Sequence, residues 1–551
     1  MSSKKSNFLV QGSILAVASI VSRVIGLLYR IPLTAIIGDH GNDYYSTAFE
    51  IYSLVLLLSS YSLPMAVSKM VSRRMAFKQY TNAYRTFKGT IAFGLIAGLI
   101  GALVIYIFAV PFCNLFKTPM AVYALRVLAP TIVIVAVMAV IRGFFQGLGT
   151  MMPSAISQVV EQIINAVVSV VAAWILYNYA LNHLIDGVEA DEYASALGAA
   201  GGTLGTGAGA LFGLLFVLFV FVLYRKRFLK MIRREQTHRK KVHVESYKSI
   251  MRILILTVVP VLLSTTIYNL VSIVDQGIFK NIATFQGYAA DDISTWWGVY
   301  AGKYRVLVNV PISISSAIAA SAVPTLSAAF GRKDRNSIKK SISMTLRFEM
   351  IIAIPCAVGL IVLASPIQRL LFGDATKLAA GLLIWGSISV IFYSISTMSN
   401  AMLQAIDKMR VPVINAIISL IVQAIAILIA MFVFHAGIYS VIAANIVFSL
   451  LMCILNGRAV FHASGFKPDI RKTFVLPAVA AVLMGFVTRM IYIVLYNITL
   501  SNAFSTIIAI ICAIILYAVF LLKSGSLTES EILSFPKGNV ILKIAKKAHL
   551  M

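Results

Sequence analysis

Long apolar runs separated by short polar segments extend along the whole chain. Fourteen of these runs are long enough to cross the hydrocarbon core of a bilayer, which takes about 20 apolar residues in a helix. Their approximate limits are residues 9–37, 46–72, 89–112, 121–148, 153–181, 196–224, 250–279, 298–328, 342–364, 377–405, 411–434, 437–460, 474–496 and 503–522. The pattern predicts an all-α polytopic membrane protein with 14 transmembrane helices.

Composition agrees with a membrane environment and gives no sign of catalysis. Of the 551 residues, 60% are hydrophobic and 12% are charged, whereas a soluble protein carries about 25% charged residues. The four cysteines lack disulfide or metal spacing, and no Gly-Lys-Ser/Thr phosphate loop or His-rich motif occurs. We therefore expect no enzyme activity, no catalytic residue, no metal and no cofactor. The membrane potential, H⁺ or Na⁺ remain as possible sources of energy.

The loops differ in charge according to the side of the membrane that they face. With the N-terminus in the cytoplasm, nearly all inward segments are rich in Lys or Arg, as the positive-inside rule requires. The outward segments are neutral or acidic and hold Asp39, Asp43, Asp186, Glu189, Asp191, Glu192, Asp291 and Asp292. This distribution accounts for much of the net charge of +27 without a nucleic-acid partner, and it predicts cytoplasmic termini and contacts between basic loops and membrane lipids.

Two halves of the chain resemble each other. Four pairs of markers recur at offsets of 255 to 260 residues: Pro111 with Pro366, Gln146 with Gln404, Pro153 with Pro412, and Pro64 with Pro324, with Ser68 and Ser327 following the last pair. Each half holds an even number of helices, so the repeat is parallel. We predict an N-lobe (1–224), a basic cytoplasmic loop (225–249), a C-lobe (250–460), an unrepeated helix pair (461–522) and a cytoplasmic tail (523–551).

Among the basic residues inside the predicted spans, where charge is expensive, four are candidates for substrate binding. Arg23 lies near the middle of the first helix, and Arg30 follows seven residues later on the same face. Arg23 either lines a water-filled cavity or forms a structural ion pair within one lobe. Lys303 and Arg305 lie in the eighth helix and point to different faces, so one of them is expected to reach a cavity. An excess of cavity bases favours a phosphate or diphosphate substrate.

Acidic residues inside the spans have two possible roles. Glu50 and Asp275 lie at a depth similar to Lys303 and are either counter-ions or sites for a coupling cation. Glu161 lies nearer mid-membrane, where a carboxyl group that changes protonation can report ion coupling. The remaining charges near helix ends are interpreted as interface anchors: Arg126, Arg142, Arg347 and Glu349.

Particular segments resemble the MurJ lipid II flippases, within the multidrug/oligosaccharidyl-lipid/polysaccharide exporter superfamily. The most specific are Ser22-Arg23-Val24-Ile25-Gly26, and Tyr300 to Pro311 followed by Val323-Pro324-Thr325-Leu326-Ser327. The likeness is closest to the Gram-positive YtgP/SpoVB-like branch and covers essentially the whole chain. It implies a bacterial cytoplasmic membrane protein of peptidoglycan synthesis, with other cell-wall synthesis proteins as possible partners.

The resemblance also implies a site. The family's cavity arginines engage the pyrophosphate of undecaprenyl-linked disaccharide-pentapeptide, and Arg23, Arg30 and either Lys303 or Arg305 match those positions. The family's arginine in the second helix has no match, because that stretch reads Ser59-Ser60-Tyr61-Ser62-Leu63. The unrepeated helix pair would form a groove for the lipid tail.

Other functions were weighed against a lipid II flippase. A flippase for another undecaprenyl-diphosphate oligosaccharide, of capsule, teichoic or spore polymers, fits the same features. A multidrug antiporter of the same fold would require cavity acids, whereas bases prevail here. A membrane-embedded glycosyltransferase would need a larger external loop with catalytic carboxylates, and a scaffold without transport activity is the remaining alternative.

Overall fold

The chain is almost entirely helical. The computed structural model describes residues 2–183, 189–238, 244–332 and 334–524, together with five single positions of the tail (529, 539, 542, 543 and 546), and no strand occurs among them. Most of the predicted cytoplasmic tail, and Asp186, therefore lie outside the described residues. The chain forms two compact units, Met1–Gly302 and Lys303–Met551.

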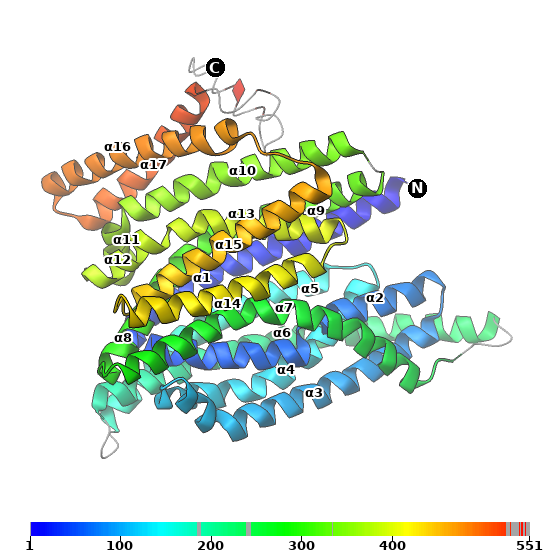
Figure 1. The fold of residues 1–551 in the computed structure, drawn as a ribbon. Coiled ribbons are helices and arrows are strands. Elements are labelled where there is room, and N and C mark those ends of the chain that lie inside the picture. Colours follow the sequence, from blue (N-terminus) through cyan, green and yellow to red (C-terminus); the bar gives the residue numbers. More distant parts are fainter. Residues whose placement is uncertain are drawn as a thin grey trace. The chain divides into compact units, whose positions relative to one another are not determined.

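The first unit begins with a helix that is broken once. Helix α1 (Ser2–Leu56) contains Gly38 at φ 68° and ψ −170°, a conformation that only glycine adopts readily. The candidate span Val17–Ala76 has 60 residues, about 90 Å of helix, which is enough for two crossings. Figure 1 shows the dark-blue start of α1 running away from the N-terminus and the chain returning to α2.

Candidate spans number 12 among the described residues, one of them being the double-length Val17–Ala76. The expected class, an all-helical membrane protein, is confirmed, and the count of 14 crossings stays a prediction. The remaining elements of the first unit are η1 (Leu57–Tyr61), α2 (Leu63–Ala76), α3 (Tyr80–Leu115), η2 (Pro119–Ala121), α4 (Val122–Gly147), α5 (Met152–Asn182), α6 (Ala190–His238), α7 (Tyr247–Phe285) and α8 (Ala290–Val299).

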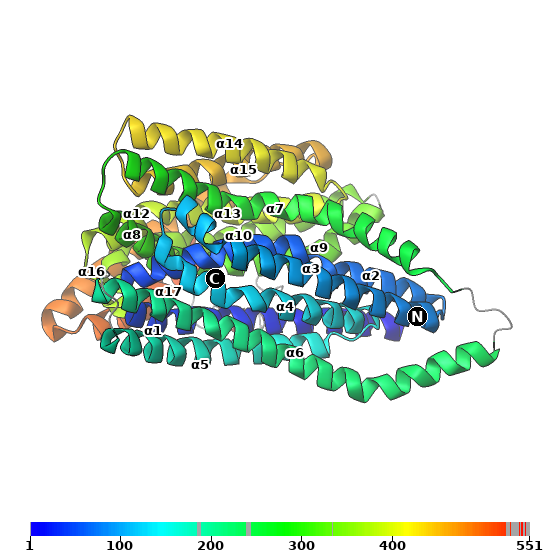
Figure 2. The ribbon, with the colours of Figure 1, turned by 90° about the horizontal axis from the view of Figure 1, so that it is seen from below.

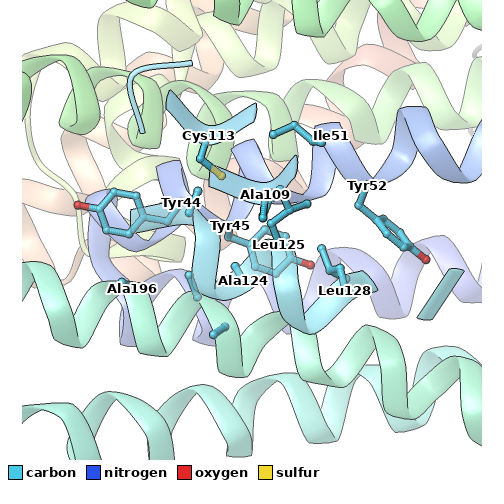
Figure 3. Close-up of a cluster of buried hydrophobic side chains, with 14 of the residues drawn as sticks. Tyr44, Tyr45, Ile51, Tyr52, Ala109, Cys113, Ala124, Leu125, Leu128 and Ala196 are labelled. Carbon is cyan, nitrogen blue, oxygen red and sulfur yellow. The ribbon is translucent and has the colours of Figure 1, made fainter. Parts of the chain in front are cut away.

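Helix α4 is the centre of the first unit and packs against α2, α3 and α6. Its side chains contribute to two buried apolar clusters. Figure 3 shows the first, in which Ala124, Leu125 and Leu128 of α4 meet Tyr45 and Tyr52 of α1. Small residues allow close helix contacts, and a Cβ atom at Gly143 would lie 2.7 Å from the carbonyl oxygen of Pro64 in α2.

Helices α7 and α8 also pack within the first unit. Helix α7 contacts α3, where Tyr247 lies against Gly89, and α8 contacts α1, where Gly298 lies against Asp39. Figure 2 shows α7 running beside α2 and α3. The compact unit therefore continues past residue 250, where we placed the start of the C-lobe. The division into transport lobes stays a prediction.

The second unit is built around α13 and carries the unrepeated helix pair. Helix α13 packs against α9, α10 and α15, and α16 and α17 pack on each other and on α10; Figure 1 shows α16 and α17 side by side. Its elements are α9 (Arg305–Gly331), α10 (Arg335–Val362), α11 (Ala364–Phe372), α12 (Lys377–Gly386), α13 (Ile388–Ala405), α14 (Arg410–Phe432), α15 (Tyr439–Ser464), η4 (Arg471–Val475), α16 (Leu476–Thr499) and α17 (Asn502–Lys523). The π-helical turn η3 (Tyr300–Tyr304) joins α8 to α9 and contains the boundary between the units.

Equivalent contacts occur within each unit at the predicted repeat positions. In the first, the backbone oxygen of Ser68 lies 2.9 Å from a Cβ atom built at Gly147, the residue after Gln146. In the second, the Ser327 hydroxyl donates to the carbonyl oxygen of Ala405, the residue after Gln404, at 2.9 Å. Ser68 and Ser327 thus each contact the helix that ends near the matched glutamine, and the internal repeat itself stays a prediction.

Candidate substrate-binding site

Arg30 is held by an aromatic ring and retains an unused donor. Its guanidinium carbon lies 4.3 Å from the centre of the Tyr45 ring, within cation–π range. Its Nη1 atom is buried and has no hydrogen-bond partner among the described residues. A guanidinium group presents five N–H donors and matches anionic oxygens well. Arg30 is therefore oriented by the protein, and one of its donors stays buried and unsatisfied among the described residues.

Arg23 lies on the same helix and is exposed. The preceding residue, Ser22, is buried, and its hydroxyl donates to the carbonyl oxygen of Gln158 in α5 at 3.4 Å. Because successive residues of a helix differ by about 100°, Arg23 points away from that helix contact. Arg23 and Arg30 are separated by about 10 Å along α1.

Glu50 belongs to a hydrogen-bonded group of α1, α7 and α8. The Ser272 hydroxyl donates to Glu50 Oε1 at 2.5 Å. With its amide oriented to satisfy both ends, Gln276 donates to Glu50 Oε2 at 3.0 Å and accepts from Trp297 Nε1 at 3.3 Å. Asp275 is 1% exposed on the same helix α7. The structure therefore brings Glu50 into contact with α7, and the ion-coupling roles of Glu50 and Asp275 stay predictions.

A buried ion pair near this group was missed by the sequence analysis. Lys280 Nζ of α7 pairs with Asp43 Oδ1 of α1 and donates to the Thr118 hydroxyl at 2.6 Å. We expected Asp43 in an outward loop, but that is wrong, because the chain is helical on both sides of Gly38 and Asp43 is 1% exposed. The only signal available was an acidic residue in a short apparent loop, together with a lysine directly after a predicted span.

Glu161 forms an ion pair within the first unit. Arg142 Nη2 of α4 lies 2.7 Å from Glu161 Oε2 of α5, and Arg142 Nε donates to the Ser157 hydroxyl at 2.8 Å. Arg142, which we interpreted as an interface anchor, is therefore the partner of this carboxylate. The pair favours a structural role for Glu161, and ion coupling at this residue is untested.

The two bases near the boundary differ in their surroundings. Lys303 is 7% exposed, and its Nζ donates to Asp374 Oδ2 at 2.7 Å. Burial raises the pKa of Asp374, but hydrogen bonds from Lys303 and Thr376 outweigh it, so the pKa lies below its usual value. Arg305 is half-buried at the start of α9. Lys303 thus has a carboxylate partner within the second unit, and the substrate-binding role of either base stays a prediction.

A pocket opens beside α2 at the repeat markers. It has a volume of about 460 Å³ and is lined by Pro64, Met65, Ser68, Lys69 and Gln146. Lys69 is exposed there and supplies a positive charge in the second helix, a few residues after the stretch that lacks an arginine. Pro64, Ser68 and Gln146, which are markers of the predicted repeat, thus line one pocket together with the cationic side chain of Lys69.

Comparison with known proteins identifies the relatives of the chain. The family model described as Lipid II flippase MurJ matches residues 57–508. The lipid II flippase MurJ of Bacillus subtilis (strain 168) is 25% identical over 435 residues, covering 76% of this chain and 77% of that protein. Stage V sporulation protein B of the same organism is 24% identical over 494 residues, covering 88% and 90% of the two chains.

Solved structures share the fold. A lipid II flippase MurJ in an inward closed conformation matches 92% of this chain and 97% of its own, with a TM-score of 0.59 and 17% identity. An inward-facing multidrug resistance transporter of the MATE family, in the MOP superfamily, matches 82% of this chain and 99% of its own, with a TM-score of 0.63 and 18% identity. The fold is thus that of MurJ and MATE transporters.

Proposed function

The chain belongs to the lipid II flippase MurJ family, and on that premise we propose that it moves an undecaprenyl-diphosphate-linked peptidoglycan precursor from the inner to the outer leaflet by alternating access. Members of this family are multi-pass proteins of the bacterial cytoplasmic membrane, and the helical spans agree with that location. In our proposal both termini face the cytoplasm, as the loop charges suggest.

The unused donor of Arg30 is the observation that carries the proposal. A buried N–H without an acceptor is costly, and a diphosphate oxygen would satisfy it with a charge-assisted hydrogen bond. Arg30 Nη1 is in this condition while the Tyr45 ring fixes the guanidinium group. Arg23, on the same face of α1, would contact the same head group, and the polyprenyl chain would stay in lipid.

A flippase for a different diphosphate-linked glycan is the second candidate. Stage V sporulation protein B is nearly as similar to this chain as MurJ is, at 24% against 25% identity, and the match is longer. Identity therefore does not decide between glycans. A multidrug antiporter shares the fold, but the positive charges of Arg23 and Arg30 on one face of α1 would repel an organic cation.

Reconstitution tests the proposal directly. Purified protein is inserted into vesicles that hold lipid II in the inner leaflet, and lipid II that becomes accessible outside is measured over time. We expect transport of lipid II above the rate in protein-free vesicles. A parallel sample holds undecaprenyl-diphosphate linked to a glycan without the pentapeptide. Transport of that lipid alone would select the second candidate, and transport of neither would reject both.

A further inference from the structure

Glu349 is a fully buried carboxyl group in the middle of a membrane-spanning helix. It lies near the centre of α10 (Arg335–Val362) and is 0% exposed. Neither of its carboxyl oxygens has a hydrogen-bond partner among the described residues. Our interpretation of Glu349 as an interface anchor is therefore wrong, because the side chain faces the interior of the second unit.

Ser315, the polar neighbour of Glu349, belongs to a pair of hydrogen-bonded serines. Ser315 of α9 is 1% exposed, and its hydroxyl donates to Ser394 of α13 at 2.8 Å. Among the described residues, Ser315 is the polar side chain close enough to act on the Glu349 carboxyl group. The site thus consists of one carboxyl group and two hydroxyl groups, contributed by three packed helices.

Cationic groups on the elements packed against α10 do not compensate Glu349. Arg489 of α16 lies mid-helix, but its Nη1 donates to the carbonyl oxygen of Val362 at 3.4 Å, about 20 Å along α10 from Glu349. Arg347 lies two residues away on α10 and so points to another side of the helix. The other cationic side chains of the packed elements lie at or near element ends: Arg305, Arg369, Lys377, Arg458, His462, Arg471, Lys472 and Lys523.

An ionised carboxylate is unfavourable in such a place. Burial of an unpaired charge is costly, and the group becomes neutral instead. Binding of one proton converts the carboxylate to a carboxylic acid whose O–H can donate to the Ser315 oxygen, and Ser315 already donates to Ser394. A metal ion would need more oxygen ligands, and no cluster of three or more acidic, His or Cys residues occurs among the searched residues.

We propose that Glu349, with Ser315 and Ser394, is a proton-binding site of the second unit that couples a proton gradient to transport. The bound proton comes from water when the carboxylate is hydrated, and it returns to water when that hydration recurs on the other side of the cycle. No other bond forms or breaks. The coupling part of this proposal rests on the proposed transport function, whereas the proton site itself does not.

Infrared difference spectroscopy on the full-length purified protein tests the proton site without any transported lipid. We expect a band of a protonated carboxylic acid that disappears in Glu349→Gln and shifts in Ser315→Ala. The matched control is Glu529→Gln, because the Glu529 side chain is 54% exposed and pairs with Lys546. A spectrum that is unchanged in Glu349→Gln overturns the site, and the Ser315→Ala protein gives the same decision if the first variant does not fold.

Transport under an imposed pH gradient, in sodium-free vesicles, tests the coupling. We expect the wild-type rate to change with the gradient and the Glu349→Gln rate to lose that response. If the wild-type transport rate does not change with the pH gradient, or changes with a sodium gradient instead, proton coupling is overturned while the proposed function stands. If the wild-type protein moves no lipid II but the infrared band still depends on Glu349, the transport function fails and the proton site stands.

Discussion

Lys280 and Asp43 form an ion pair with side chains only 1% and 2% exposed, linking α7 to the part of α1 that follows Gly38. The Thr118 hydroxyl accepts a hydrogen bond from Lys280 at 2.6 Å, and the Trp297 ring centre lies 5.9 Å from the same Nζ. The pair therefore joins three segments of the first unit that are far apart in the sequence.

Removal of one partner of this pair should destabilise the protein. Lys280→Met leaves the Asp43 charge buried, and breaking a buried pair from one side costs about 3–5 kcal/mol. We expect a lower thermal unfolding temperature in detergent for Lys280→Met. The double variant Lys280→Met/Asp43→Asn should recover most of the loss, because no unpaired charge remains. Equal stability of the single variant and the wild type would show that the pair contributes little.

Transport should require Arg30, and the planar shape of its guanidinium group should affect the rate as well as its charge. Charge-assisted hydrogen bonds contribute about 1.5–3 kcal/mol each, so Arg30→Ala should slow lipid II transport about 10- to 100-fold. Arg30→Lys should recover only part of this rate, because an ammonium group lacks the planar fork. Tyr45→Phe keeps the ring beneath the guanidinium group and serves as the control. Full activity of Arg30→Ala would remove this residue from the site.

Added volume at the α1–α8 contact should be harmful. A Cβ atom at Gly302 would lie 2.4 Å from Asn42 Cγ, and one at Gly298 would lie 1.9 Å from the backbone oxygen of Asp39. Overpacking of this kind costs about 1–3 kcal/mol, so Gly298→Ala should lower thermal stability and slow transport. Gly331→Ala is the matched control, since beyond its own turn of helix no atom of the described residues lies within 4 Å of its Cβ position. Similar results for both variants would contradict the close contact.

The pair of Lys303 with Asp374 should give a pH-dependent stability. The pKa of Asp374 is below its usual value in the folded protein, so its stabilising contribution is present above the unfolded pKa and is lost as the pH falls through the folded pKa. We expect Asp374→Asn to be less stable than the wild type at neutral pH, with the difference shrinking in acid. Unfolding temperatures measured from neutral pH to about pH 3 check this, and a difference that grows in acid would reverse the assignment.

The helical class was readable from the sequence because it depends on local pattern, whereas the repeat stays a prediction. Apolar runs predict the helices, and the markers Ser68 and Ser327 each contact the helix that ends near the matched glutamine. Partners of charged side chains were not readable, because they depend on which helices pack together. Asp43 was assigned to a loop and Glu349 to an interface, although both are buried, and no local pattern distinguishes such positions from exposed ones.

The π-helical turn at Tyr300–Tyr304 changes the relation between residue spacing and side-chain direction in the eighth span. A turn that holds one extra residue rotates everything beyond it by about 100° relative to a continuous α-helix. If the residues from Trp297 to Arg305 are treated as one continuous α-helix, the direction predicted for one of these two side chains is therefore wrong. If the extra residue moved along the chain, the segment that it passed would rotate about the helix axis while its backbone hydrogen bonds were kept. Each side chain of that segment would then contact a different neighbour.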